Sequence, residues 1–248
     1  MNATETPVEA AIAELRLGPP SRWLWGTTIV GILAFIGTQI YGFTTPPDAN
    51  MGNLVKIMFV HVPTAEISFL AVLVMFISSI LYLVRRQERH DLLGAAGAEV
   101  GAILTALTLV QGSIWGRPTW GIWWTWDARL TSEAVMLVIL VGYLALRSFT
   151  EDSGRRARWS AAVAILGALN SVIVYWSVQW WRTLHQPHSS PMTVAKPYRY
   201  ALRANDISML LIFIALVAWR YRAARIERAA ELLREEAALQ QGGSHVAL

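Results

Sequence analysis

The chain has 248 residues, of which 54% are hydrophobic and only 15% are charged. A soluble domain carries about a quarter charged residues, so this composition excludes an ordinary water-soluble globule. So many apolar and aromatic side chains also exclude a disordered chain. The sequence contains no cysteine, which rules out disulfides, thiolate-held metal centres and a cysteine nucleophile. The class that remains is an all-α polytopic membrane protein.

Residues 1–22 predict a helix that lies on the membrane surface, not a signal peptide. The leader carries Glu5, Glu9 and Glu14, whereas a signal peptide begins with a short basic region. The segment 6–9 has the sequence Thr-Pro-Val-Glu, which is typical of a capping box with proline at the first helical position. We therefore expect an N-terminal interfacial helix.

Six apolar stretches are predicted to cross the membrane, because a helix needs about 20 apolar residues to span the hydrocarbon core. They define a six-span membrane domain over residues 23–222, followed by a helical tail over 223–248. The sixth stretch is short, and we expect it to extend back through residues 201–206. The six predicted spans are 24–43, 65–84, 92–114, 130–149, 159–178 and 207–221.

The distribution of lysine and arginine predicts the orientation of these spans. Fourteen of the 21 basic residues fall on one side of the predicted membrane, and the more basic side is cytoplasmic. Both termini are therefore expected in the cytoplasm. The three outer loops are then 44–64, 115–129 and 179–206.

The second outer loop, 115–129, is rich in tryptophan. An interfacial aromatic belt needs only one or two rings at each helix end, and this explains most of the other tryptophans. Here the rings alternate with Gly116, Pro118 and Gly121, which we expect to bend the backbone. An apolar platform for a large flat ligand fits better, since each aromatic contact adds about 0.5–1.5 kcal/mol. The five rings belong to Trp115, Trp120, Trp123, Trp124 and Trp126.

Two histidines are predicted beside this loop. His61 continues an apolar i, i+3, i+4, i+7 pattern that starts at Leu54, on a helix expected to begin at Asn53. Pro63 is expected to kink or restart that helix. His185 follows two tryptophans in the third outer loop.

A pair of neutral imidazoles that face each other across an aromatic slot can ligate haem iron without any cysteine. His61 and His185 are the candidate axial ligands, and His188 is a reserve candidate. The expected ligand is haem b, bound non-covalently. Its propionates require cations, and these can come from the loop residues Arg117, Arg129 and Arg182.

Four carboxylates lie in or near the predicted spans. Glu66, Glu133 and Asp206 fall in the first turns of spans that begin on the outer side, where a carboxylate stabilises the helix dipole. Glu99 lies within the third span, where a carboxylate is costly and normally faces the bundle interior or water. The surrounding segment 97–101 is a GxxxG motif, which indicates close helix packing.

Three segments together resemble the CcmC (haem exporter protein C) family of cytochrome c maturation. They are the WWD-type segment WGRPTWGIWWTWDARLTSEAV, the sequence FVHVP around His61, and the sequence WWRTLHQP around His185. Larger CcmF and CcsA-type haem proteins share the WWD motif but have more spans and longer chains. The resemblance covers about residues 20–222.

The resemblance implies a haem-binding protein that is not an enzyme, located in the bacterial inner membrane with its site facing the periplasm. It implies that His61 and His185 are the axial ligands, and that the five tryptophans and Asp127 form the platform. Such proteins present haem to the periplasmic chaperone CcmE. They act with CcmD and with the ABC transporter subunits CcmA and CcmB.

From the residues alone, two other functions stay open. A b-type electron-transfer subunit would carry histidine pairs deep in its spans, but none of the predicted spans contains a histidine. A secondary transporter of haem or another small molecule favours internal repeats and polar groups at the midplane. Glu99 alone gives that alternative little support.

Overall fold

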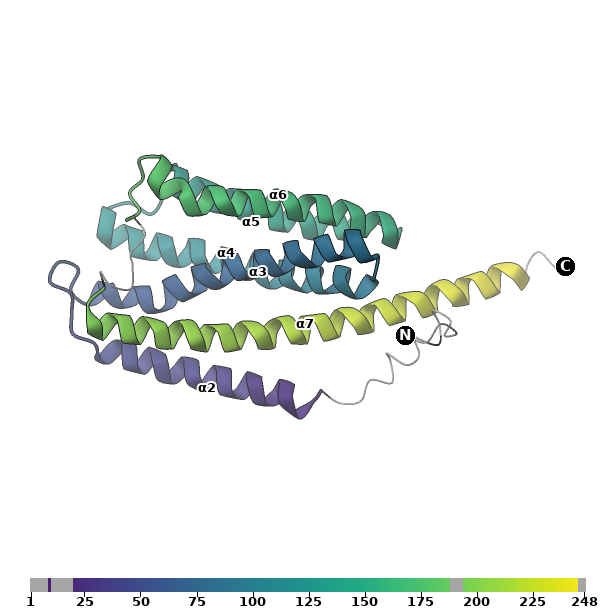
Figure 1. Ribbon diagram of the computed structural model, residues 1–248, viewed down its shortest axis with the longest axis horizontal. Coiled ribbons are helices and arrows are strands. Elements are labelled where there is room, and N and C mark those ends of the chain that lie inside the picture. The colour runs from purple at the N-terminus through teal and green to yellow at the C-terminus, as the bar shows by residue number, and fades with distance from the viewer. Residues whose placement is uncertain (1–8, 10–19, 188–193, 245–248) are drawn as a thin grey trace.

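The computed structural model describes residue 9 and residues 20–187 and 194–244. In this part of the chain six helices are long and apolar enough to cross a membrane, which confirms the predicted all-α fold (Figure 1). The predicted interfacial helix over residues 1–22 lies almost entirely outside the described residues. The six are α2 (Arg22–Thr44), α3 (Met58–Arg85), α4 (Glu88–Trp120), α5 (Ala128–Phe149), α6 (Ser153–Trp180) and α7 (Lys196–Ser244).

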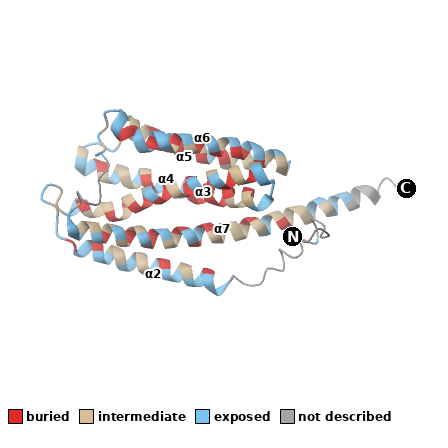
Figure 2. Cartoon of the chain, in the orientation of Figure 1, coloured by how far each residue is buried: buried red, intermediate tan, exposed pale blue. Residues whose placement is uncertain are grey.

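Helices α3 and α4 pack against each other at the centre of the bundle, with α5 and α6 on one side and α2 and α7 on the other (Figure 1). Buried residues lie mainly on the inward faces of the helices, whereas α2 is largely exposed (Figure 2). Exposed leucine and isoleucine on α2, such as Leu33 and Ile40, are the side chains that lipid would cover. We call the end of the bundle that holds segments 45–57, 121–127 and 181–187 the tryptophan-rich end.

Small residues allow α4 to approach α3 closely. A Cβ atom added at Gly97 would lie 3.1 Å from the backbone nitrogen of Met75 and 3.2 Å from the carbonyl oxygen of Ala71. At Gly101 it would lie 3.3 Å from the Cβ of Ala71. A Cβ at either position would lie closer to α3 than ordinary van der Waals contact, so the close packing predicted from the GxxxG motif is confirmed.

Pro63 does not interrupt its helix, so the predicted restart is wrong, while the predicted kink stays a prediction. A 3₁₀ turn, η1 (Asn53–Ile57), leads directly into α3, which is continuous through Pro63. Proline removes the hydrogen bond that the carbonyl of Phe59 would otherwise accept. The side-chain amide of Gln39 on α2 donates to that carbonyl at 3.3 Å. The freed carbonyl thus has a partner, and the helix tolerates the proline.

The predicted outer loops are too long. Helix α4 continues to Trp120, so Gly116 and Pro118 lie inside it and do not bend the chain as expected. A Cβ at Gly116 would lie 3.1 Å from the ring of Trp120, so this glycine makes room for that indole. The helix ends at Gly121, whose φ of 82° suits glycine.

Helix α7 continues beyond the bundle as one helix and passes through residues 222 and 223 without a break. Ion pairs hold this extension to the end of the bundle opposite the tryptophan-rich end. Arg156 binds Glu231 at 3.2 Å, and Arg228 binds Glu88 at 2.6 Å. Glu99 is paired with Arg220. That pairing explains how α4 accommodates a carboxylate within a span.

A buried ion pair joins α4 to α5 at the same end. The guanidinium of Arg147 donates to both carboxylate oxygens of Asp91, at 2.6 and 2.8 Å, and to the hydroxyl of Ser160 at 3.3 Å. Asp91 is only 8% exposed. Because each charge depends on the other for its solvation, this pair fixes how α4, α5 and α6 meet.

We predict that Arg147→Gln lowers the free energy of unfolding by about 3–5 kcal/mol, because it leaves the Asp91 carboxylate buried and unpaired. The double variant Arg147→Met, Asp91→Leu should lose less. Circular dichroism during unfolding in mixed micelles measures both. As a control, Glu227→Gln removes a largely exposed partner of Arg220 and should cost below about 1 kcal/mol. If Arg147→Gln proved as stable as Glu227→Gln, the prediction would be contradicted.

Candidate functional site

A cavity of about 560 Å³ lies at the tryptophan-rich end, within the usual size range of small-molecule sites. We call it the central cavity. Residues of α3, α4, α5, α6 and α7 line it, together with the segment 184–187. Six of the predicted site residues are among them: His61, Trp115, Trp120, Trp124, Arg129 and His185.

His61 projects from the first turns of α3 and is 9% exposed. Its ring meets Trp115 edge to face, with 5.7 Å between the centroids. Gly112 of α4 makes room for the ring, since a Cβ there would lie 3.2 Å from its Cε1. The Nδ1 atom is buried and has no hydrogen-bond partner within the described part of the chain. A buried polar atom without a partner is a common mark of a ligand site.

His185 reaches the same cavity from the segment that follows α6. Its Nδ1 lies 2.9 Å from the carbonyl oxygen of Gln186. When Nδ1 carries the proton and donates to that carbonyl, Nε2 keeps a lone pair for a ligand. The ring lies 6.5 Å from that of Trp120. Each candidate imidazole therefore contacts a different tryptophan of α4.

Asp127 does not line the cavity but joins the two segments that form it. Its carboxylate accepts hydrogen bonds from the N–H of Leu130 at 3.0 Å, the hydroxyl of Thr183 at 2.7 Å and the N–H of Leu184 at 3.0 Å. Burial opposes ionisation, but these donors outweigh it and lower the pKa of Asp127. The carboxylate thus caps α5 and holds the segment that carries His185.

The five tryptophans divide into two groups. Trp115, Trp120 and Trp124 line the central cavity. Trp123 and Trp126 are 59% and 79% exposed. Trp124 and Trp126 are in edge-to-face contact at 5.5 Å, so the inner wall and the outer surface are continuous. The expected platform therefore has a face toward the cavity and a face toward the surroundings.

Three loop cations were predicted, and they have different positions. Arg182 is exposed and is not part of the cavity lining, which leaves Arg117 and Arg129. Arg117 donates to the carbonyl of Gly121 at the end of α4 and is not part of the cavity lining. Arg129 lines the cavity. Its guanidinium donates to the carbonyl of Val174 at 2.7 Å and lies 5.9 Å from the ring centroid of Phe69. Of the two, only Arg129 offers a cationic group at the central cavity.

Glu66, Glu133 and Asp206 also reach the cavity. The prediction that they lie in the first turns of their helices is wrong for Glu66 and Asp206, because α3 already begins at Met58 and α7 at Lys196. Glu133 is only 7% exposed and lies one turn after Arg129. Arg199 and Arg203 of α7 line the cavity too. The sequence offered one signal for these charged residues: they lie near the outer ends of their predicted spans. Span ends on the same side of a membrane come together at one end of the bundle.

We predict that Asp127→Ala exposes the backbone of segment 181–187, because three donors lose their common acceptor. Losing the α5 cap should itself cost about 1 kcal/mol. Hydrogen–deuterium exchange, read from peptides covering this segment, should be faster than in the wild type. Asp152→Ala is the matched control, because Asp152 caps α6 at the opposite end of the bundle through the N–H of Arg155. Equal exchange of segment 181–187 in both variants would disprove the positioning role.

The chain matches the sequence model of the family described as CcmC, Heme exporter protein C, over residues 14–236. It is 40% identical over 198 residues to a Heme exporter protein C from Bradyrhizobium diazoefficiens, covering 78% of this chain and 74% of the relative. The relative of the same name from Paracoccus denitrificans is 36% identical over 203 residues, covering 79% and 84%.

The Heme exporter protein C of Escherichia coli K12 is 35% identical over 214 residues, covering 86% of this chain and 80% of the relative. These matches extend over most of the membrane bundle, so they confirm the resemblance drawn from the tryptophan-rich and histidine-containing segments. The chain therefore belongs to the haem exporter protein C (CcmC) family, multi-pass membrane proteins of cytochrome c maturation.

Proposed function

We propose that this chain holds one haem in the central cavity with His61 and His185 as axial ligands, and presents it to the periplasmic chaperone CcmE. One observation carries the proposal: two histidines far apart in the sequence line a single cavity. Three tryptophans line that cavity with them. The family match supports haem as the ligand.

The residues present suit haem b. His61 has a buried ring nitrogen without a partner in the described structure, and the imidazole of His185 lines the same cavity. Two neutral imidazoles give low-spin iron without a covalent link to the protein. The indoles supply apolar contact with the macrocycle. Arg129 is the proposed partner of a propionate, and the same role for Arg117 stays a prediction from the sequence.

The proposed orientation places the tryptophan-rich end in the periplasm and both termini in the cytoplasm. It rests on the excess of lysine and arginine at the opposite end of the bundle. We propose CcmD, CcmA and CcmB as the other partners, because the family works within that system. The pairing of Glu99 with Arg220 removes the residue that favoured a midplane transport site. Presentation is thus better supported than transport.

We predict that His61→Ala and His185→Ala each abolish or strongly change the low-spin spectrum of haem that co-purifies with the full chain. The physical reason is the loss of one axial nitrogen. Adding imidazole to the solution should restore low-spin iron in both variants. Visible absorption after reduction is the measurement.

His90→Ala is the control, because His90 lies at the start of α4, away from the tryptophan-rich end. His188→Ala tests the reserve candidate, which falls outside the described residues. An unchanged spectrum in both His61→Ala and His185→Ala would refute the proposed ligands. Loss of the spectrum in His61→Ala and His188→Ala, but not in His185→Ala, would replace His185 by His188.

We predict that substitutions in the two groups of tryptophans affect different steps, haem binding in one group and haem transfer in the other. Trp120→Ala removes a ring that lines the cavity and contacts His185, so it should reduce the haem bound. Trp126→Ala removes a largely exposed ring and should leave the haem spectrum intact while slowing transfer to purified CcmE. Equal effects of the two variants on both measurements would argue against this division.

A further inference from the structure

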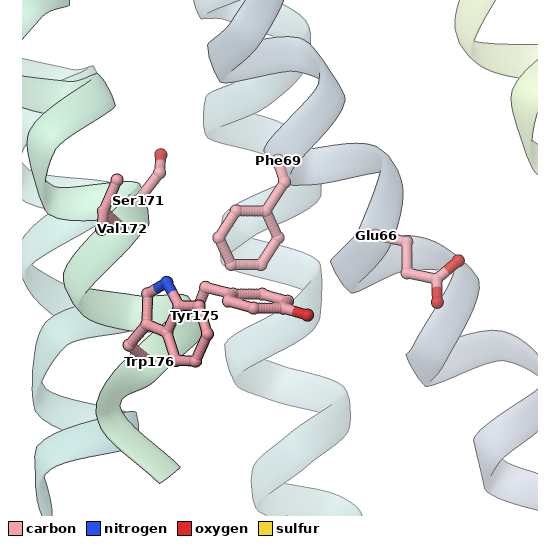
Figure 3. Close-up of a pocket in the computed structure, with 6 residues that line it drawn as sticks. All are labelled: Glu66, Phe69, Ser171, Val172, Tyr175 and Trp176. Atoms are coloured by element: carbon pink, nitrogen blue, oxygen red, sulfur yellow. The ribbon is translucent and has the colours of Figure 1, made fainter. Parts of the chain in front are cut away.

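A second hollow opens on the side of the bundle between α3 and α6 (Figure 3). Its volume is about 370 Å³, and we call it the side groove. Three of its residues also line the central cavity: Glu66, Phe69 and Tyr175. The two hollows therefore share a wall. The full lining of the side groove is Glu66, Phe69, Ser171, Val172, Tyr175 and Trp176.

The side groove opens on the lipid-facing side of the bundle and not at its tryptophan-rich end. Val172 is 50% exposed and lies eight residues before the end of α6 at Trp180, which is about 12 Å along the helix. Trp176 stacks on Trp180 with 6.1 Å between the centroids. Stacked indoles near a helix end are typical of the membrane interface. The groove thus faces the part of the hydrocarbon layer next to that interface.

Two aromatic side chains form the wall between the groove and the cavity. Phe69 extends from α3 and Tyr175 extends from α6 into the space between the helices (Figure 3). On the cavity side, the guanidinium of Arg129 lies 5.9 Å from the ring centroid of Phe69. Exposed side chains change rotamer within nanoseconds, and Tyr175 is 47% exposed. Rotation of this ring is the opening motion that a passage through the wall requires.

Glu66 gives the side groove a charge where lipid alone would not favour one. Its side chain is exposed on α3 and reaches both hollows. Carboxylates at membrane depth face water or a ligand path, because lipid cannot solvate them. This charge disfavours a phospholipid phosphate in the groove. It equally disfavours haem propionates there, so a haem would pass with its apolar edge leading.

We propose that the side groove is a lateral opening through which haem passes between the outer leaflet of the bilayer and the central cavity. The proposal rests on the proposed haem-binding function. Continuity with the cavity and the three aromatic rings of the lining favour a flat aromatic ligand over a lipid chain. The ligands of the iron remain His61 and His185, and the groove residues only control access.

The test uses the full chain, free of haem and reconstituted in nanodiscs. Haem is supplied either dissolved in phospholipid vesicles or on a soluble carrier protein, and the rise of the Soret band gives the loading rate. Val172 lines the side groove but not the central cavity, so Val172→Trp narrows the groove and leaves the proposed iron ligands in place. We expect loading from vesicles to slow about tenfold, because binding then requires a further opening step. The final low-spin spectrum should match that of the wild type.

Ile173→Trp is the matched control, since Ile173 is also exposed on α6 but lies outside the groove. Phe69→Ala thins the shared wall and should speed loading from vesicles. Equal rates for Val172→Trp and Ile173→Trp, with normal final spectra, would overturn the lateral opening and leave the haem site standing. So would loss of a co-purified phospholipid from Val172→Trp at an unchanged loading rate. A wild-type chain that takes up no haem would reject both proposals.

Discussion

A membrane span must satisfy its backbone hydrogen bonds within the helix, and this constraint decides where the chain can place its chemistry. Backbone that is not helical is therefore confined to the places where the spans end. The central cavity lies at such a place, at the tryptophan-rich end. Gly112 and Gly116 of α4 leave the space that His61 and Trp120 occupy. The site is thus a consequence of how the five helices α3 to α7 meet at this end of the bundle.

One carboxylate holds the irregular part of this end in order. Asp127 accepts hydrogen bonds from its own helix and from the segment that carries His185. The position of that imidazole therefore depends on a residue of the tryptophan-rich segment. The same physical logic links Gln39 to Phe59, where a side chain on α2 satisfies the carbonyl that Pro63 leaves free. In both cases a polar side chain forms hydrogen bonds with backbone groups that have no partner within a helix.

Much of this structure was predictable from the residues, because the signals were local. Apolar stretches of bilayer length predicted all six spans, and the GxxxG motif predicted the contact of α4 with α3. The helix ends were less predictable. Pro63 and Pro118 look like breaks in the sequence, but both lie inside helices. The compensation for Pro63 comes from Gln39, which lies on another helix, and sequence periodicity cannot reveal such a partner.

In the candidate site, too, the residues were predictable from local signals, whereas the contacts between them were not. His61, His185 and the cavity tryptophans could be named from residue type and topology. The tie from Asp127 to Thr183 joins residues 56 positions apart, and only the fold brings them together. The shared wall of Phe69 and Tyr175 is likewise a contact between distant helices. Interactions across the bundle, not within a segment, are what the sequence left unpredicted.

The central claim is that two imidazoles bind one haem in the central cavity. Pulsed electron paramagnetic resonance on the ferric, haem-loaded full chain tests it most directly, with protein labelled with ¹⁵N at histidine only. We expect a low-spin signal with couplings from two labelled imidazole nitrogens. A signal with coupling to one labelled nitrogen, or to none, would contradict the account.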